Sequence, residues 1–177
     1  LRGVLTPEEQ IKKQMAEFVV GTLEAPRSEF SGFPVCPFVK ADRVADQLLL
    51  MVFDNEKETL VDIIKQFIRS GKRSALIAQM NEEIGRHETK EYQKFINVLL
   101  SEAGLSDVRC VCFNPKDDLE IEGFNARSSA PCFLINLSYK KDLVRAHNAL
   151  KKTTYYDKMP EKYINYLGIK TQTKGTQ

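Results

Sequence analysis

No run of apolar residues in the sequence approaches the roughly 20 that a membrane-spanning helix needs. Residues 1–4 also lack the long hydrophobic stretch of a secretory signal. The 26 lysine and arginine residues nearly balance the 24 aspartate and glutamate residues, so charge indicates neither nucleic acid nor an anionic membrane as a partner. These absences predict a cytoplasmic protein that binds no nucleic acid and no membrane.

Several common nucleotide-binding and catalytic motifs are missing as well. The chain has no Gly-x-Gly-x-x-Gly after a strand pattern, no Gly-x-x-x-x-Gly-Lys-Ser/Thr, no Gly-x-Ser-x-Gly and no His-Glu-x-x-His. Dinucleotide-binding, P-loop, serine-hydrolase and zinc-protease functions therefore lose support. The sequence identifies no cofactor, and it leaves open whether the protein is an enzyme.

The four cysteines form neither an evident disulfide pattern nor a zinc site. Cys110 and Cys112 lie two residues apart in an apolar run, which places both on one face of a strand. A Cys-x-Cys pair is narrower than the usual zinc-binding spacing, and only two histidines exist to complete a site. We expect buried, reduced thiols and no metal.

A length of 177 residues and a hydrophobic content of 42% suit one domain with one substantial core. Hydrophobic spacing predicts the order helix, strand, helix, strand, helix, strand, strand, helix, helix. We therefore expect a single α/β domain over residues 1–170, with a four-stranded mixed, partly parallel sheet packed with amphipathic helices. The polar tail over 171–177 is expected to be flexible.

Capping residues and hydrophobic spacing predict the individual elements. Thr6 and Pro7 predict a helix over 7–24, and the apolar run 47–53 predicts a central strand covered on both faces. Prolines make 25–45 an ordered but irregular connection. Further strands are predicted at 74–80, 108–113 and 132–137. Further helices begin at Asn55, Thr89, Ser138 and Pro160, and Phe95 is expected on a buried face.

Cys36 lies between Pro34 and Pro37. Because Pro37 restricts Cys36 toward extended backbone, the thiol is held on a stiff, irregular stretch. Lys40 and Arg43 could lower the pKa of this thiol if they fold toward it, since a nearby cation favours the thiolate. Cys36 is therefore a candidate catalytic nucleophile. The alternative is that its segment simply plugs one end of the core.

The connection 114–130 is long for a compact domain, and such loops are often functional. The guanidinium of Arg127 matches a carboxylate or a phosphate. Asn125, Ser128 and Ser129, with backbone amides, could complete an anion site around it. The alternative is that Arg127 only holds the loop in place by pairing with one of its acidic residues: Asp117, Asp118, Glu120 or Glu122.

The two histidines give weaker signals. Glu83 and His87 would stand one helical turn apart, a spacing that suits a metal or a proton relay, although a solvated helix entry is the simpler interpretation. His147 is a candidate base for Cys36 only if the fold brings the two together. A histidine at the edge of the core is the alternative.

Four stretches recur in the order of a known pattern: Cys36-Pro37-Phe38-Val39-Lys40, Phe113-Asn114-Pro115, Asn125-Ala126-Arg127-Ser128-Ser129-Ala130-Pro131 and 159–168. Together they resemble a bacterial family of unknown function whose members carry a Cys-Pro-Phe-Ala motif shortly after an N-terminal helix. Val39 replaces the usual alanine, and Ser129-Ala130-Pro131 stands where the family has a tighter Arg-Ser-Pro. The resemblance spans most of the chain and brings no reaction or cofactor. It implies that the cysteine segment and the Arg127 loop belong to one pattern.

We expect the Cys36 segment, residues 33–40, to meet the Arg127 loop, residues 114–130, at one end of the sheet, where such folds bind ligands. There the ligand-binding residues Lys40, Asn125, Arg127, Ser128 and Ser129 would hold a small anionic metabolite, and Cys36 would act as nucleophile or wall.

The competing hypothesis is a noncatalytic interaction or assembly subunit, with a protein partner or a second copy docked on exposed aromatic residues. The candidates for that patch are Phe30, Phe33, Tyr155, Tyr156 and Tyr166. A thiol-redox role for Cys36 with another cysteine is a third possibility, which needs a pair within disulfide reach.

Overall fold

The computed structural model describes residues 3–80 and 88–167. Its four strands form one sheet in the order β1-β2-β4-β3. β1 is parallel to β2, whereas β4 is antiparallel to both β2 and β3. The predicted α/β fold with a mixed, partly parallel sheet is confirmed. The strands are β1 (Leu48–Phe53), β2 (Ser74–Gln79), β3 (Val108–Phe113) and β4 (Leu134–Tyr139).

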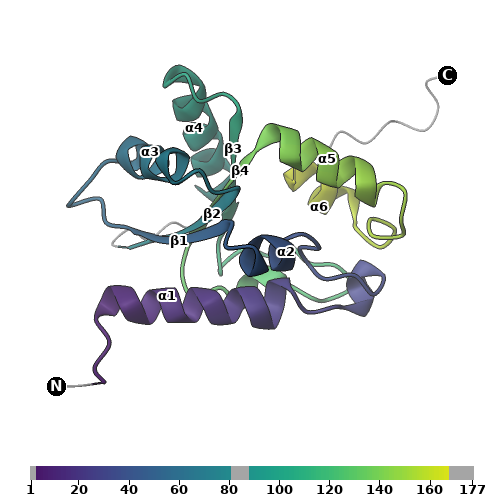
Figure 1. Ribbon diagram of the computed structural model, residues 1–177. Coiled ribbons are helices and arrows are strands. Elements are labelled where there is room, and N and C mark those ends of the chain that lie inside the picture. Colours follow the sequence, from purple (N-terminus) through teal and green to yellow (C-terminus); the bar gives the residue numbers. More distant parts are fainter. Residues whose placement is uncertain (1–2, 81–87, 168–177) are drawn as a thin grey trace.

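Helices cover both faces of this sheet. Figure 1 shows α1 on one side of the strands and α3 with α4 on the other. In the described residues, no helix is both long enough and apolar enough to cross a membrane. The α-helices are α1 (Pro7–Phe18), α2 (Val39–Val44), α3 (Leu60–Ser70), α4 (Thr89–Glu102), α5 (Lys140–Leu150) and α6 (Glu161–Tyr166).

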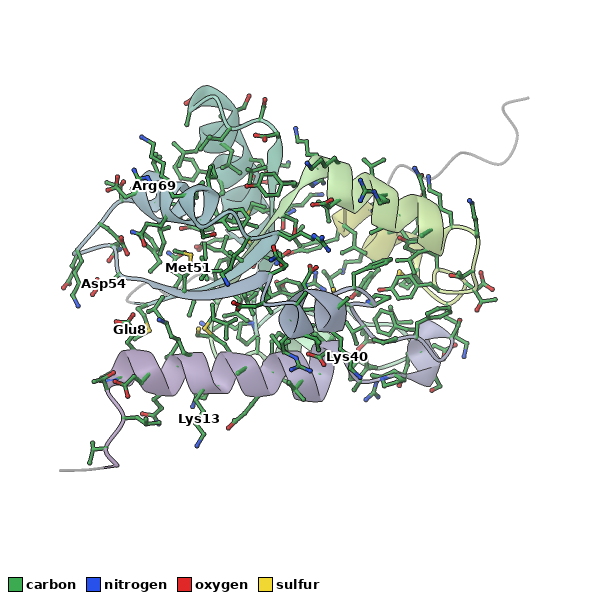
Figure 2. The ribbon with its side chains drawn as sticks, in the orientation of Figure 1. Glu8, Lys13, Lys40, Met51, Asp54 and Arg69 are labelled. Carbon is green, nitrogen blue, oxygen red and sulfur yellow. The ribbon has the colours of Figure 1, made fainter. Side chains whose placement is uncertain are left out.

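Because side chains along each strand alternate between the two faces of the sheet, the core is divided into two clusters. Leu76 and Ala78 of β2 face the cluster that contains α1, whereas Ala75 and Ile77 face the cluster that contains α3 and α4. We call the first the α1-side core. Besides α1 it includes side chains from the loop before β4 and from the segment around α6. Figure 2 shows the side chains filling both layers.

The caps of the first helices follow from their sequences. Thr6 accepts a hydrogen bond from Glu9 N at 3.1 Å and Pro7 opens α1, as predicted. The helix predicted over 7–24 continues past Phe18 as a π-helical stretch, Val19–Leu23. The start predicted at Asn55 is wrong, because Thr59 and Asp62 form the capping box of α3.

Other predictions need correction. β1 is an edge strand rather than a central one, because β4 takes the place on the far side of β2. The connection 25–45 contains α2, and β4 extends to Tyr139, so Ser138 does not cap α5. Phe95 is 57% exposed instead of buried. The predicted tail 171–177 and the pair Glu83 and His87 lie outside the described residues.

The outer edge of β3 is covered by side-chain amides of α4. Asn97 donates to Cys110 O at 3.2 Å and accepts from Cys110 N at 3.0 Å. Gln93, one turn earlier, accepts from Cys112 N at 2.8 Å. These bonds satisfy backbone groups that an edge strand otherwise leaves open, and they fix α4 against the strand that leads into the Arg127 loop.

Replacing Asn97 by alanine is expected to lower the free energy of unfolding by about 1–3 kcal/mol, because it leaves the N–H and C=O of Cys110 without their partner. Urea denaturation followed by circular dichroism measures this change. The matched control is Asn148→Ala on the exposed side of α5, which should change stability by less than about 0.5 kcal/mol. Equal effects of the two substitutions would contradict the edge-capping role.

Candidate functional site

Arg127 is 1% exposed and is among the largest fully buried side chains of the described residues. It lies on a short 3-10 helix, Ala126–Ser129, in the connection between β3 and β4. Asn125 builds this turn: its Oδ1 accepts from Arg127 N at 3.0 Å, and its Nδ2 donates to Asp117 O at 2.6 Å. Asn125 therefore positions both Arg127 and Asp117.

Aromatic rings surround the guanidinium of Arg127. Its central carbon lies 4.9 Å from the ring centre of Phe113, 4.8 Å from that of Tyr166 and 5.5 Å from that of Tyr163. Such rings favour a cation through their electron-rich faces. Nη1 also donates to the Tyr163 hydroxyl at 3.4 Å. We call these residues, with Asp117, the Arg127 cluster.

Among the described residues, one edge of the guanidinium forms no hydrogen bond, and we call it the open edge. Within the described part of the chain, Nε and Nη2 of Arg127 are buried and have no hydrogen-bond partner. Asp117 Oδ2 lies 3.7 Å from Nε, which is an ion-pair contact but too long for a hydrogen bond. Two adjacent N–H groups are the geometry that holds a carboxylate through two parallel bonds.

Asp117 is the buried acidic partner in this cluster, with 7% of its surface exposed. Burial raises the pKa of its carboxyl, against the opposing effects of Arg127 and of a hydrogen bond from Thr89. Tyr166 Oη lies 3.4 Å from Asp117 Oδ2 and 3.3 Å from Cys112 O. The alternative predicted for Arg127, contact with an acidic residue of its own loop, is thus seen with Asp117.

A surface cleft adjoins the Arg127 cluster at Tyr166. Its volume is about 420 Å³. Glu161 and Lys162 give its lining both signs of charge, and Lys162 also pairs with Asp118 at 3.6 Å. Tyr166 lines the cleft, and its ring centre also lies 4.8 Å from the guanidinium carbon of Arg127. The lining residues are Lys90, Leu119, Glu161, Lys162, Asn165 and Tyr166.

Among the described residues, no hydrogen bond joins the other predicted ligand-binding residues to the guanidinium of Arg127. Ser128 Oγ donates to Asn125 O at 2.7 Å, and Ser129 Oγ donates to Ala126 O at 3.0 Å. Both hydroxyls therefore stabilise the turn itself. Lys40 is exposed on α2 (Figure 2). Of the predicted set, the structure brings Asn125 and Arg127 together.

Cys36 is half-buried, and its backbone is fixed by bonds from Cys36 N to Leu23 O at 2.9 Å and from Val39 N to Cys36 O at 3.3 Å. Burial raises the pKa of its thiol, and the nearby carboxylate of Asp42 raises it further. The predicted lowering by cations is wrong, since Arg43 instead pairs with Glu24, with Nε 2.5 Å from a carboxylate oxygen.

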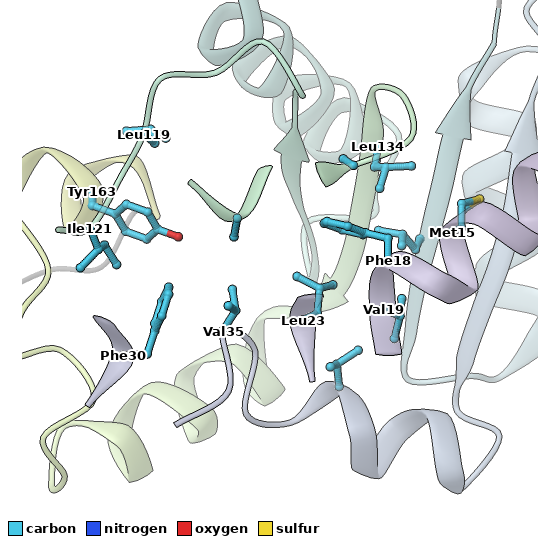
Figure 3. Packing of buried hydrophobic residues seen from close by; sticks show 14 of the residues in the cluster. Met15, Phe18, Val19, Leu23, Phe30, Val35, Leu119, Ile121, Leu134 and Tyr163 are labelled. Atoms are coloured by element: carbon cyan, nitrogen blue, oxygen red, sulfur yellow. The ribbon is translucent and has the colours of Figure 1, made fainter. Parts of the chain in front are cut away.

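The Cys36 segment and the Arg127 loop nevertheless pack against the same α1-side core. Tyr155 donates to Val35 O at 2.5 Å, and its ring centre lies 5.6 Å from that of Phe30. Phe30 in turn lies 6.4 Å from Tyr163, which contacts Arg127. Figure 3 shows Val35 and Phe30 beside Tyr163 within this core. The two segments are joined through aromatic rings rather than across an open pocket.

The patch of exposed aromatic residues predicted for partner docking is wrong in two of its members. Phe30 is 1% exposed and Tyr155 is 6% exposed, because both rings lie at the centre of the α1-side core. Phe33, Tyr156 and Tyr166 are half-buried around them. Phe30 and Tyr155 therefore belong to the core beneath the candidate site and not to a surface.

The remaining titratable candidates are engaged elsewhere. His147 Nδ1 forms a hydrogen bond with the Tyr156 hydroxyl, and burial lowers the pKa of this imidazole. Cys110 and Cys112 share one buried face of β3, as predicted, with their sulfur atoms 3.6 Å apart. All four cysteines are free thiols. The described residues contain no group of three side chains arranged to hold a metal.

The raised pKa of Cys36 predicts slow thiol chemistry at neutral pH. With DTNB at pH 7.5, the folded protein should react at Cys36 at no more than about a tenth of the rate of glutathione, because little thiolate forms. The rate should climb steeply toward pH 9. Mass spectrometry of the labelled protein, compared with Cys36→Ser, identifies the residue. Rapid labelling of Cys36 at pH 7 would contradict this account and favour an activated nucleophile.

Sequence reasoning did not find the aromatic members of the cluster as site residues. Tyr163 and Tyr166 are three residues apart on α6, so they share one helical face and both reach the guanidinium. Phe113 ends β3 immediately before the loop. The spacing of the two tyrosines could have predicted that they share one helical face, but it does not indicate an arginine as their partner.

With this geometry in view, comparison with protein-family models, curated proteins and solved structures finds no match to the chain, so the family resemblance stays a prediction.

Proposed function

We propose that the protein binds a small anionic metabolite at the buried guanidinium of Arg127. The open Nε and Nη2 edge carries this proposal. A buried donor without a hydrogen bond costs about 1–3 kcal/mol, and more when it is charged. An anion at this edge would satisfy both donors and remove that cost.

The surroundings favour an anion over a neutral ligand. The rings of Phe113 and Tyr166 exclude water from the guanidinium, which strengthens its attraction for a negative charge. Asn125 bonds to the backbone of both Arg127 and Asp117, so the guanidinium donors are positioned before a ligand arrives.

Cys36 belongs to the wall of the same core in this proposal. Its thiol is neutral at physiological pH because burial raises its pKa. A thiol-dependent reaction would require the bound ligand to change that environment. Binding alone needs no such change, and it is the function that the geometry supports best.

A thermal-shift screen of carboxylates, phosphates and sulfate tests this proposal. A binding anion at 100 times its dissociation constant should stabilise the wild type by about 2.7 kcal/mol. Arg127→Lys keeps the charge but loses the paired donors, so it should lose this stabilisation. Arg69→Lys, at an exposed position on α3 (Figure 2), is the matched control and should keep it. Equal shifts in the wild type and Arg127→Lys would refute binding at Arg127.

An interaction subunit is the second candidate function. Phe95 and Val98 lie three residues apart on α4 and are 57% and 55% exposed, so they form a small apolar surface. Size-exclusion chromatography with light scattering would favour this function if the protein is dimeric and Phe95→Ser with Val98→Ser makes it monomeric. A monomeric wild type would weigh against self-association.

A further inference from the structure

We infer that the ligand at Arg127 is a monocarboxylate and that it binds together with one proton, which Asp117 holds. This inference rests on the proposed function and specifies its ligand. It comes from the shape of the open guanidinium edge and from the number of charges buried beside it.

Shape favours a carboxylate. Nε and Nη2 lie in one plane and point in similar directions, which matches the two oxygens of a planar carboxylate. The rings of Phe113 and Tyr166 lie 4.9 and 4.8 Å from the guanidinium carbon. Arg127 is only 1% exposed, and burying an anion with one charge costs less than burying a dianion.

The charge count requires a proton. Arg127 is the cation of the cluster, and Asp117 lies 3.7 Å from its Nε. With Asp117 ionised, the pair is already neutral, so a bound monoanion would leave one buried negative charge without compensation. Such a charge is costly away from water. Uptake of one proton by Asp117 restores neutrality, whereas a dianion would need a second proton or cation.

The groups that face Asp117 allow this protonation. Among the described residues, Tyr166 from α6, Thr89 from α4 and Cys112 from β3 are neutral side chains beside Asp117, and Arg127 supplies a positive charge. Burial already raises the pKa of Asp117, and a bound anion would raise it further. Once protonated, the carboxyl can donate a hydrogen bond to the bound carboxylate, whose other contacts come from the guanidinium.

Calorimetry of acetate binding tests the inference. Titrations of the wild type between pH 5 and pH 9, in buffers that differ in ionisation enthalpy, report the protons taken up. We expect uptake to approach one proton as the pH rises above the pKa of Asp117 in the ligand-free protein. Above that pKa, the dissociation constant for acetate should rise about tenfold per pH unit. Zero uptake over the whole range, with a constant affinity, would overturn the inference.

Two variants separate Asp117 from its neighbour. Asp117→Asn carries a permanent neutral amide, so its acetate affinity should not depend on pH and should exceed that of the wild type at pH 9. Asp118→Asn changes an exposed carboxylate that pairs with Lys162, and it should keep the wild-type pH dependence. If Asp117→Asn does not fold, the proton uptake of the wild type still decides.

Failure of the inference is distinguishable from failure of the proposed function. Inorganic phosphate that binds at pH 8 as tightly as acetate, and is lost in Arg127→Lys, would keep the anion site and refute the monocarboxylate. Acetate that binds without proton uptake would keep the anion site and refute the proton held by Asp117. Anions that affect the wild type and Arg127→Lys alike would refute both.

Discussion

Replacement of Arg127 by alanine is expected to lower the free energy of unfolding by about 3–5 kcal/mol. The substitution leaves the carboxyl of Asp117 buried without its cation, and it empties the space between Phe113, Tyr163 and Tyr166. The loop also loses the side chain on which these rings pack. Chemical denaturation at pH 7 measures the loss.

The charge and the volume of Arg127 can be separated. Arg127→Met retains much of the volume, and combining it with Asp117→Asn removes the unpaired charge as well. The double variant should recover a large part of the stability that Arg127→Met loses, because replacing both members of a buried pair is often close to neutral. A loss below about 1 kcal/mol for Arg127→Ala would show that the cluster is not a structural unit.

Phe30→Ala is expected to cost about 3–5 kcal/mol, because it opens a cavity in the α1-side core. Phe30 is 1% exposed, and its ring centre lies 5.6 Å from that of Tyr155 and 6.4 Å from that of Tyr163. The first of these tyrosines holds the Cys36 segment and the second contacts Arg127. The cavity should therefore loosen both segments at once.

Amide hydrogen exchange checks that coupling. In Phe30→Ala, protection should fall in the Cys36 segment and in the Arg127 loop together, while β2 stays comparatively protected. Phe95→Ala is the matched control, since this ring is 57% exposed and its loss should cost less than about 1 kcal/mol. A fall in protection confined to the residues next to Phe30 would contradict the shared core.

The secondary structure was largely predictable because its signals are local. Thr6 and Pro7 specify the start of α1 through the chain next to them, and apolar runs locate the strands. Strand order is not local: β1 reads as a central strand because it is apolar throughout, but its place at the edge depends on β4 pairing with β2. Where two residues could cap one helix, the prediction was less accurate: Asn55 was expected to begin α3, but Thr59 is its cap.

Some polar residues of the candidate site were predictable, but their environment was not. Arg127, Asn125 and Asp117 stand out in the sequence as members of one long polar loop. Their burial depends on α6, which follows more than 30 residues later and supplies two rings to the cluster. The pKa of Cys36 shows the same limit, because burial and Asp42 raise it, whereas Arg43, which is near Cys36 in sequence, pairs with Glu24.

The most direct measurement of the central claim is the NMR signal of the Arg127 Nε–H group during titration with sodium acetate. The signal is assigned by its loss in Arg127→Lys. Acetate bound at the open edge should shift this resonance downfield and protect its proton from exchange with water, with saturation at the concentration that stabilises the protein. If acetate stabilises the protein while the Arg127 Nε–H signal stays unchanged, or if neither changes, the guanidinium is not the binding site.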